Sequence, residues 1–204
     1  MHPYKIDDDI RNRVILGAAA ISVFVAWLSS LLLSLLPLHI PWWLETPSIL
    51  GVYGIIVWLF DQYLWKTQLV QRFGFIRIPD LNGVWRGEIR SSHGNFEPPH
   101  VVSIVIRQTA TTISICAESA SSESQSVTAT FHKKEGLSKY ELVYNYVNRP
   151  KAHSVDTMSI HYGTAWLKVS DDMGVLDGDY FTGRGRQTFG SITASRNTKA
   201  LPHS

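Results

Sequence analysis

The sequence has almost no cysteine and no strong charge bias. Its 204 residues include one cysteine, Cys116, so no disulfide can form within the chain. A disulfide-stapled secreted module is therefore excluded. The formal net charge of +2 favours neither nucleic acid nor an acidic surface as a partner. We expect no DNA or RNA partner and, from the length, one soluble domain with some chain left over.

Charge is also missing from a long run near the N-terminus. No charged residue lies between Val14 and Leu36, and about 23 apolar residues suffice for a helix to cross a membrane. A cleaved signal peptide is the alternative, but the run is too long and shows no small-residue cleavage pattern before Pro37. In the next apolar run, Thr46 is the predicted N-cap and Pro47 the first helical residue. The sequence thus predicts transmembrane helices at 14–36 and 47–65, joined by a periplasmic loop at 37–46.

Lysine and arginine are absent from this connecting loop and gather at the other ends of both predicted helices. Cytoplasmic flanks of membrane helices carry an excess of these residues. We therefore expect both termini in the cytoplasm of a bacterium, with residues 1–13, the linker 66–79 and everything after it on that side of the inner membrane. The residues that carry this bias are Lys5, Arg11, Arg13, Lys66, Arg72 and Arg77.

Small residues recur at every fourth position of the first predicted helix. Such a ridge lets another helix backbone approach closely. Two alternatives stay open: contact with the second helix of the same chain, or contact between chains in a homo-oligomer. The candidate oligomerisation residues are Ala18, Ser22, Ala26 and Ser30, with Ser34 continuing the ridge.

After residue 79 the hydrophobic period changes from helical to alternating. Val102, Ile104 and Ile106, for example, alternate with Ser103 and Arg107. We predict an all-β soluble domain at 80–197, an eight-stranded up-and-down β-barrel of lipocalin-like size, followed by a tail at 198–204. A two-sheet sandwich is the alternative. The predicted strands are Val84–Arg90, Val101–Gln108, Thr112–Glu118, Ser126–Lys133, Tyr140–Val147, Ser159–Val169, Val175–Phe181 and Gly190–Ser195.

Motifs of catalysis and metal binding are scarce. Asp171-Asp172-Met173-Gly174 has the composition of a turn and lacks the spacing of a calcium loop. The histidines show no zinc-ligand spacing, and no G-x-S-x-G elbow is present. Gly183-Arg184-Gly185-Arg186 lacks the G-K-[ST] ending of a phosphate-binding loop. We expect no catalytic residue, no metal and no cofactor, and therefore a protein that is not an enzyme.

Aromatic and arginine side chains instead indicate a binding site. Aromatic rings stack on bases, and arginine binds phosphate through paired hydrogen bonds. Tyr144 and Tyr146 share one strand face, whereas Arg184 and Arg186 lie together near a predicted hairpin. The alternatives are that these tyrosines, with Trp85 and Trp166, form ordinary core and that the arginines are solvated. The serine-rich run 119–126 is predicted to be a mobile loop, with ligand contact by its hydroxyls as the alternative.

Five segments, in order along the β domain, carry a family resemblance. They are Asp80-Leu81-Asn82-Gly83-Val84-Trp85-Arg86-Gly87, the serine-rich turn, Tyr144-x-Tyr146-x-Asn148-x-Pro150, His161-x-Gly163-Thr164-Ala165 and Gly178-x-Tyr180-Phe181-Thr182-x-Arg184. Behind a two-helix anchor, this series resembles the membrane-anchored cyclic-dinucleotide receptor effectors of bacterial CBASS antiphage systems, the CD-NTase-associated type.

The resemblance implies a function in antiviral defence. A CD-NTase would make a cyclic dinucleotide, the barrel would bind it, and the protein would form a homo-oligomer whose helices disrupt the lipid bilayer and kill the infected cell. The alternative function is a membrane-tethered barrel that carries a lipid or other apolar ligand. The candidate ligand-binding residues are Trp85, Tyr144, Tyr146, Asn148, His161, Thr164, Tyr180, Thr182, Arg184 and Arg186.

Overall fold

A computed structural model describes residues 1–6, 10–34, 42–68, 70, 78–133, 140–183 and 186–197. The chain forms two compact units. Asp8–Ile78 make the helical unit, whereas Met1–Asp7 and Pro79–Ser204 together make the β unit. The short N-terminal segment thus belongs to the β unit, although the helices separate it from the rest of that unit along the chain.

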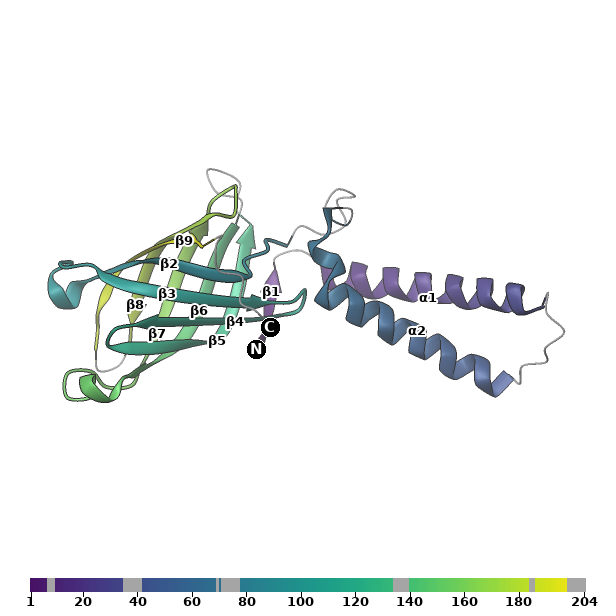
Figure 1. The fold of residues 1–204 in the computed structure, drawn as a ribbon, viewed down its shortest axis with the longest axis horizontal. Coiled ribbons are helices and arrows are strands. Elements are labelled where there is room, and N and C mark those ends of the chain that lie inside the picture. Colours follow the sequence, from purple (N-terminus) through teal and green to yellow (C-terminus); the bar gives the residue numbers. More distant parts are fainter. Residues whose placement is uncertain are drawn as a thin grey trace. The chain divides into compact units, whose positions relative to one another are not determined.

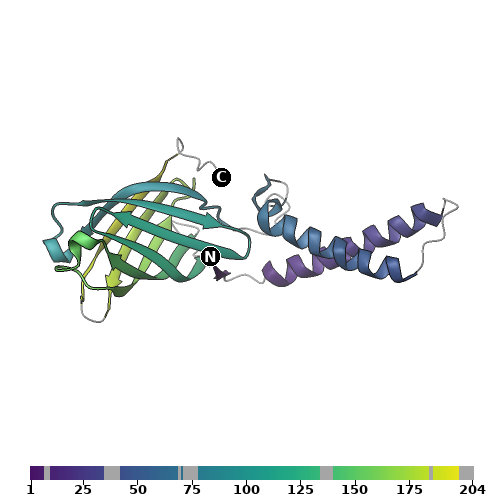
Figure 2. The ribbon, with the colours of Figure 1, turned by 60° about the horizontal axis from the view of Figure 1, so that its bottom comes forward.

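The helical unit contains α1 (Ile10–Ser34), α2 (Trp42–Gln62) and a 3-10 turn, η1 (Leu64–Lys66). Each helix overlaps one of the two predicted spans, α1 beginning four residues and α2 five residues earlier than predicted. Figure 2 shows α1 and α2 as two long helices. The predicted start of the second helix is wrong: α2 begins at Trp42, so Thr46 is not its N-cap and Pro47 lies inside it. A proline lacks only its own backbone N–H, although it disturbs the turn before it. The residues before Pro47 keep their N–H groups, so they can extend the helix toward its N-terminus.

None of the helices in the described part of the chain has both the length and the apolar character required to cross a membrane.

Small residues of α1 are covered within the helical unit. Ala18 and Ser22 are buried, and the Ser22 hydroxyl donates to the Ala18 carbonyl at 2.7 Å. Ala26 is half-buried and Ser30 is exposed. Because α1 packs against α2, the first half of the ridge is buried within this chain and its second half remains accessible.

The β unit is a closed barrel (Figure 1). Eight antiparallel strands follow one another around it, β2 pairs with β9, and β4 pairs with β5 to close the ring. All eight predicted strands are confirmed within a few residues, and closure excludes the sandwich. The strands are β2 (Gly83–Ser91), β3 (His100–Gln108), β4 (Thr112–Ser119), β5 (Ser122–Lys133), β6 (Tyr140–Pro150), β7 (His161–Val169), β8 (Val175–Thr182) and β9 (Phe189–Arg196).

A ninth strand that the sequence did not reveal, β1 (His2–Ile6), is inserted where β4 and β5 separate. It pairs with β4 through His2 and Pro3, and it runs parallel to β5 from Tyr4 to Ile6. The ring of Tyr4 meets Phe131 edge-on at 5.4 Å between centroids, and its hydroxyl donates to the carbonyls of Thr109 and Ala110. The N-terminal segment therefore completes the barrel wall.

The barrel interior is packed with apolar side chains over much of its length. Trp85, Phe131 and Leu142 are fully buried, and Gln108 is a buried polar side chain at the same end of the barrel. The Gln108 side chain accepts from the Leu81 amide at 3.0 Å and donates to the Pro79 carbonyl at 3.1 Å. This packing lies at the end of the barrel at which β1 is inserted, and a cavity opens at the opposite end.

Candidate functional site: a polar cavity at one end of the barrel

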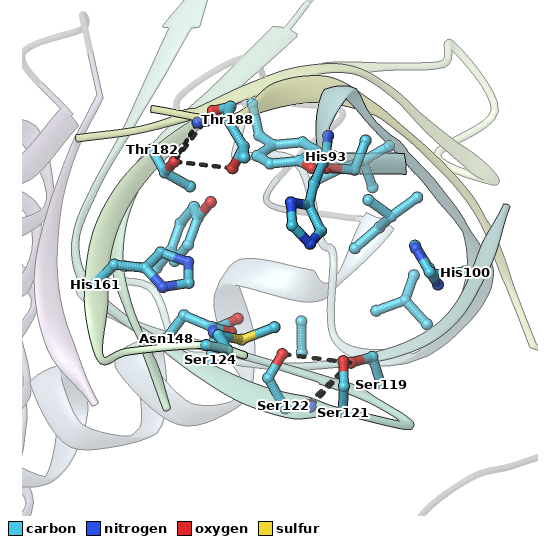
Figure 3. Close-up of a pocket in the computed structure, with 18 of the residues that line it drawn as sticks. His93, His100, Ser119, Ser121, Ser122, Ser124, Asn148, His161, Thr182 and Thr188 are labelled. Carbon is cyan, nitrogen blue, oxygen red and sulfur yellow. Dashed lines mark hydrogen bonds between the residues drawn. The ribbon is translucent and has the colours of Figure 1, made fainter. Parts of the chain in front are cut away.

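A cavity of about 140 Å³ opens at the barrel end opposite β1. Its lining comes from the last residues of the even-numbered strands and the first residues of the odd-numbered ones, such as Asn148 of β6 and His161 of β7 (Figure 3). Polar side chains dominate at the rim, and Val102, Ile104 and Ile192 lie deeper. The cavity is therefore a cup above the packed core.

Three tyrosines form one wall of this cup: Tyr144, Tyr146 and Tyr180. The rings of Tyr144 and Tyr146 are 6.0 Å apart and tilted by 50°. Burial raises the pKa of all three phenols above the ordinary value for tyrosine. The phenols therefore keep their protons and can donate hydrogen bonds to an anionic group.

Glycines make room for these rings. A Cβ atom on Gly163 would lie 2.4 Å from Cζ and the hydroxyl of Tyr146, and one on Gly190 would lie 2.9 Å from Cε1 of Tyr180. The glycine in the predicted His161-x-Gly163 segment is thus required by the packing of a cavity tyrosine. Any side chain there would push the ring toward the cavity space.

Serine hydroxyls of the β4–β5 hairpin form the part of the wall beside Asn148 and the two tyrosines of β6. The predicted mobile loop at 119–126 is wrong: β4 and β5 form a tight hairpin in which the Ser119 hydroxyl accepts from the Ser122 amide at 3.2 Å. Alternating residues of β5 then point inward, because side chains alternate between the two faces of a strand. Four serines of the hairpin and its turn line the cavity, namely Ser119, Ser121, Ser122 and Ser124 (Figure 3).

The β8–β9 loop holds an arginine at the cavity. Thr182 and Thr188 close the base of the loop with a 2.9 Å bond between hydroxyls and a 2.8 Å bond from the Thr188 amide to the Thr182 hydroxyl. The Thr182 hydroxyl, which was predicted to contact the ligand, therefore holds the base of the loop. Arg186 lines the cavity, and its charge acts on Tyr146, Tyr180 and His161. Arg184 lies outside the described residues.

Two of the predicted residues meet across neighbouring strands. Asn148 and His161 are directly opposite in the β6–β7 register, and both are buried and face the cavity. The Asn148 amide nitrogen donates to the sulfur of Met158 at 3.2 Å. Nδ1 of His161 lies 2.9 Å from the Ser159 carbonyl oxygen. Burial chiefly lowers the pKa of His161, assisted by the charge of Arg186 and opposed by the Ser159 bond.

Trp85 and Thr164 do not line the cavity. Trp85 is fully buried in the packed core, where its indole nitrogen donates to the Leu81 carbonyl at 3.0 Å. Thr164 faces outward and donates to Asn145 Oδ1 at 2.7 Å. Trp166 also faces outward and lies against Phe181, with ring centroids 6.3 Å apart. Side chains alternate along β7, and its odd-numbered residues point into the barrel. Thr164 and Trp166 therefore cannot line the cavity.

The lining has no acidic side chain among the described residues. Arg186 supplies positive charge to the lining, and hydroxyls, imidazoles, an amide and a thioether supply the remaining polar contacts. No cluster of three or more metal-ligating side chains occurs in the described ranges. Such a cavity suits a ligand with negative charge and hydrogen-bonding edges. The lining residues that sequence reasoning missed include Ser91, His93, His100, Met158 and Thr188.

Comparison with known proteins places this barrel and these helices in one family. The family model described as Cap15, cyclic dinucleotide receptor domain, matches residues 76–196, and the model described as Cap15, TM helices, matches residues 12–66. CD-NTase-associated protein 15 of Yersinia aleksiciae is 34% identical over 149 residues, which cover 72% of this chain and 68% of the relative. The protein of the same name from Staphylococcus schleiferi is 31% identical over 124 residues, covering 61% and 64%. The resemblance predicted from the sequence motifs is thus confirmed, and the chain belongs to the Cap15 family of cyclic-dinucleotide receptors with transmembrane helices.

Proposed function

We propose that this protein is a CBASS effector whose barrel cavity binds a cyclic dinucleotide made by a CD-NTase. The observation that carries the proposal is the composition of the cavity: its lining combines protonated tyrosines, Arg186 and serine hydroxyls, with no carboxylate among the described lining residues. A cyclic dinucleotide has two phosphate charges and two flat bases. Arginine and hydroxyl donors match the phosphates, and tyrosine rings match the bases.

The size of the cavity favours partial insertion of this ligand. Pockets that enclose a drug-sized ligand measure roughly 300–1,000 Å³, whereas the cavity measures about 140 Å³. One base and its neighbouring phosphate would enter, and the other nucleotide would remain at the mouth. A second subunit would then contact the exposed half, which gives the ligand a higher affinity for the assembled form.

Assembly is the proposed link from binding to membrane damage. A ligand drives a population from 1:99 to 99:1 only when it binds the favoured state more tightly by roughly 5.5 kcal/mol. A ligand shared between subunits supplies such a difference. Because Ala18 and Ser22 are buried in the helical unit, the accessible residues of the ridge, Ala26 and Ser30, are the proposed contacts between chains.

In this proposal the helical unit spans the inner membrane twice. The positively charged residues that flank the predicted spans favour a barrel and two termini in the cytoplasm, where the messenger is made. Oligomerisation of the helices then disrupts the membrane and kills the infected cell. The protein acts as a receptor and not as a catalyst.

A lipid-carrier function finds less support. An apolar ligand needs an apolar hollow, but Trp85, Phe131 and Leu142 fill that part of the interior. The remaining space is bounded by serine, histidine and arginine side chains.

Isothermal titration calorimetry of the full chain in detergent micelles tests the proposal. The probes are c-di-AMP, c-di-GMP, c-di-UMP and 3′,3′-cGAMP, each at low and high salt. We expect saturable binding of at least one probe, weakened by Arg186→Ala. No heat and no thermal stabilisation with any probe would refute the proposed function.

A further inference from the structure

Asn148 and His161 form an opposed pair of polar side chains in the cavity lining. The two residues face each other across β6 and β7, and side chains directly opposite in an antiparallel pair have Cβ atoms about 4.5–5.5 Å apart. Both are buried and both point into the cavity (Figure 3). One base edge can therefore meet both side chains.

The tautomer of His161 follows from its hydrogen bond. A backbone carbonyl only accepts, so Nδ1, at 2.9 Å from the Ser159 oxygen, carries the proton. Burial disfavours the doubly protonated ring and lowers its pKa. The second nitrogen, Nε2, is then unprotonated and presents a lone pair to the cavity.

The amide of Asn148 is oriented by the same reasoning. Its nitrogen lies 3.2 Å from the sulfur of Met158, and a thioether accepts but cannot donate. The carbonyl oxygen Oδ1 therefore points away from Met158. No donor to Oδ1 is found among the described residues, so this oxygen is a second acceptor available to a ligand.

The other acceptors of the described lining are not free and adjacent in this way. The Met158 sulfur already accepts from Asn148, and His93 and His100 lie between β2 and β3 and on β3. The hydroxyls can donate or accept, the arginine only donates, and no carboxylate is present. We propose that Nε2 of His161 and Oδ1 of Asn148 form an acceptor pair that selects guanine in the bound dinucleotide. This inference rests on the proposed function and names the base read by the same cavity.

Guanine matches the pair by its chemistry. Its Watson–Crick edge presents two adjacent donors, N1–H and the N2 amino group. Adenine and cytosine offer one amino donor beside a ring acceptor on that edge, and uracil offers one N–H between two carbonyls. The remaining guanine atom, the O6 carbonyl, needs a donor, which the hydroxyls and Arg186 supply.

Removing one guanine donor tests the pair without altering the protein. The full chain in detergent micelles is titrated with c-di-GMP, with its inosine counterpart, which lacks the N2 amino group, and with c-di-AMP. We expect c-di-GMP to bind about tenfold or more tightly than either of the others, because well-formed base contacts discriminate by that order. Equal affinity for the guanine and inosine ligands would overturn the proposal.

Two cavity variants and two matched controls complete the test. His161→Phe and Asn148→Leu should each reduce the ratio of the affinities for the guanine and inosine ligands to about 1–3. Asn145→Leu, on the outer face of the same strand, and His153→Phe, in an exposed loop, should keep it. A preference that survives both cavity variants would refute the role of the pair. Absence of any dinucleotide binding would refute the proposed function itself.

Discussion

The ring of Tyr146 lies directly over Gly163, so that a Cβ atom added to the glycine would stand 2.4 Å from Cζ and the hydroxyl of the tyrosine. We predict that Gly163→Ala forces Tyr146 out of its place in the cavity wall. Overpacking of this kind costs about 1–3 kcal/mol of folding free energy. Urea unfolding should show that loss, and calorimetry should show weaker binding of the cyclic dinucleotide.

Gly94→Ala is the matched control for this substitution. No atom lies within 4 Å of a Cβ added at Gly94, and the residue is exposed. Its variant should unfold and bind like the unaltered protein. If both alanine variants behaved alike, the contact between Gly163 and Tyr146 would not shape the cavity.

Arg186→Ala should weaken ligand binding while the barrel stays folded. A hydrogen bond to a charged group contributes about 1.5–3 kcal/mol, so we expect roughly a tenfold to hundredfold loss of affinity. The salt dependence of binding should also decrease, because one positive charge near the phosphates is removed. Arg107→Ala, on the outer face of β3, serves as the control. An unchanged affinity in Arg186→Ala would exclude a phosphate contact by this arginine.

Tyr4→Ala should destabilise the barrel although Tyr4 precedes the helices in sequence. The substitution removes the edge-on contact with Phe131 and the hydrogen bonds to the carbonyls of Thr109 and Ala110. Loss of a partly buried ring with its hydrogen bonds should cost about 1–3 kcal/mol. Thermal unfolding of the full chain measures the effect, with Lys5→Ala, an exposed neighbour on the same strand, as the control. A melting temperature equal to that of the control would show that β1 contributes little to the wall.

Ala26→Leu should hinder assembly and spare ligand binding. Ala26 is half-buried on the accessible part of the α1 ridge, where a larger side chain holds a second helix away. A misfit of about 1–3 kcal/mol corresponds to roughly a fivefold to hundredfold decrease in the assembly constant. Light scattering in detergent with saturating ligand measures the oligomer, and Ala20→Leu on an exposed position is the control. Oligomers of unchanged size and stability in Ala26→Leu would remove the ridge from the proposed interface.

Much of the barrel was predictable because its apolar residues alternate. The alternation of Val102, Ile104 and Ile106 is by itself enough to assign one face of β3 to the barrel interior. The serine-rich hairpin escaped prediction because its inward residues are hydroxyls, which carry no hydrophobic pattern. Strand β1 escaped because a five-residue strand acquires its partners only where β4 and β5 separate, a property of the tertiary structure.

The sequence predicts whether a site residue faces the barrel interior, but not how far along the barrel axis the residue lies. Alternation correctly indicates that Trp85 points inward, yet it does not tell which end of the barrel the residue occupies. The parity of β7 was available to exclude Thr164, since His161, Gly163 and Ala165 share the inner face and Thr164 must point outward. His100 shares the face of Val102, and this parity is the signal that was available to find it.

Photo-crosslinking tests most directly whether the ligand binds inside the barrel cup. The full chain in detergent is irradiated with an azido-substituted cyclic dinucleotide, and the labelled residues are identified by mass spectrometry. We predict labels at cavity residues such as Tyr146, His161 and Tyr180, suppressed by excess unmodified ligand. Competed labels confined to the outer wall, for example at Trp166, or to the helices would contradict binding in the cup.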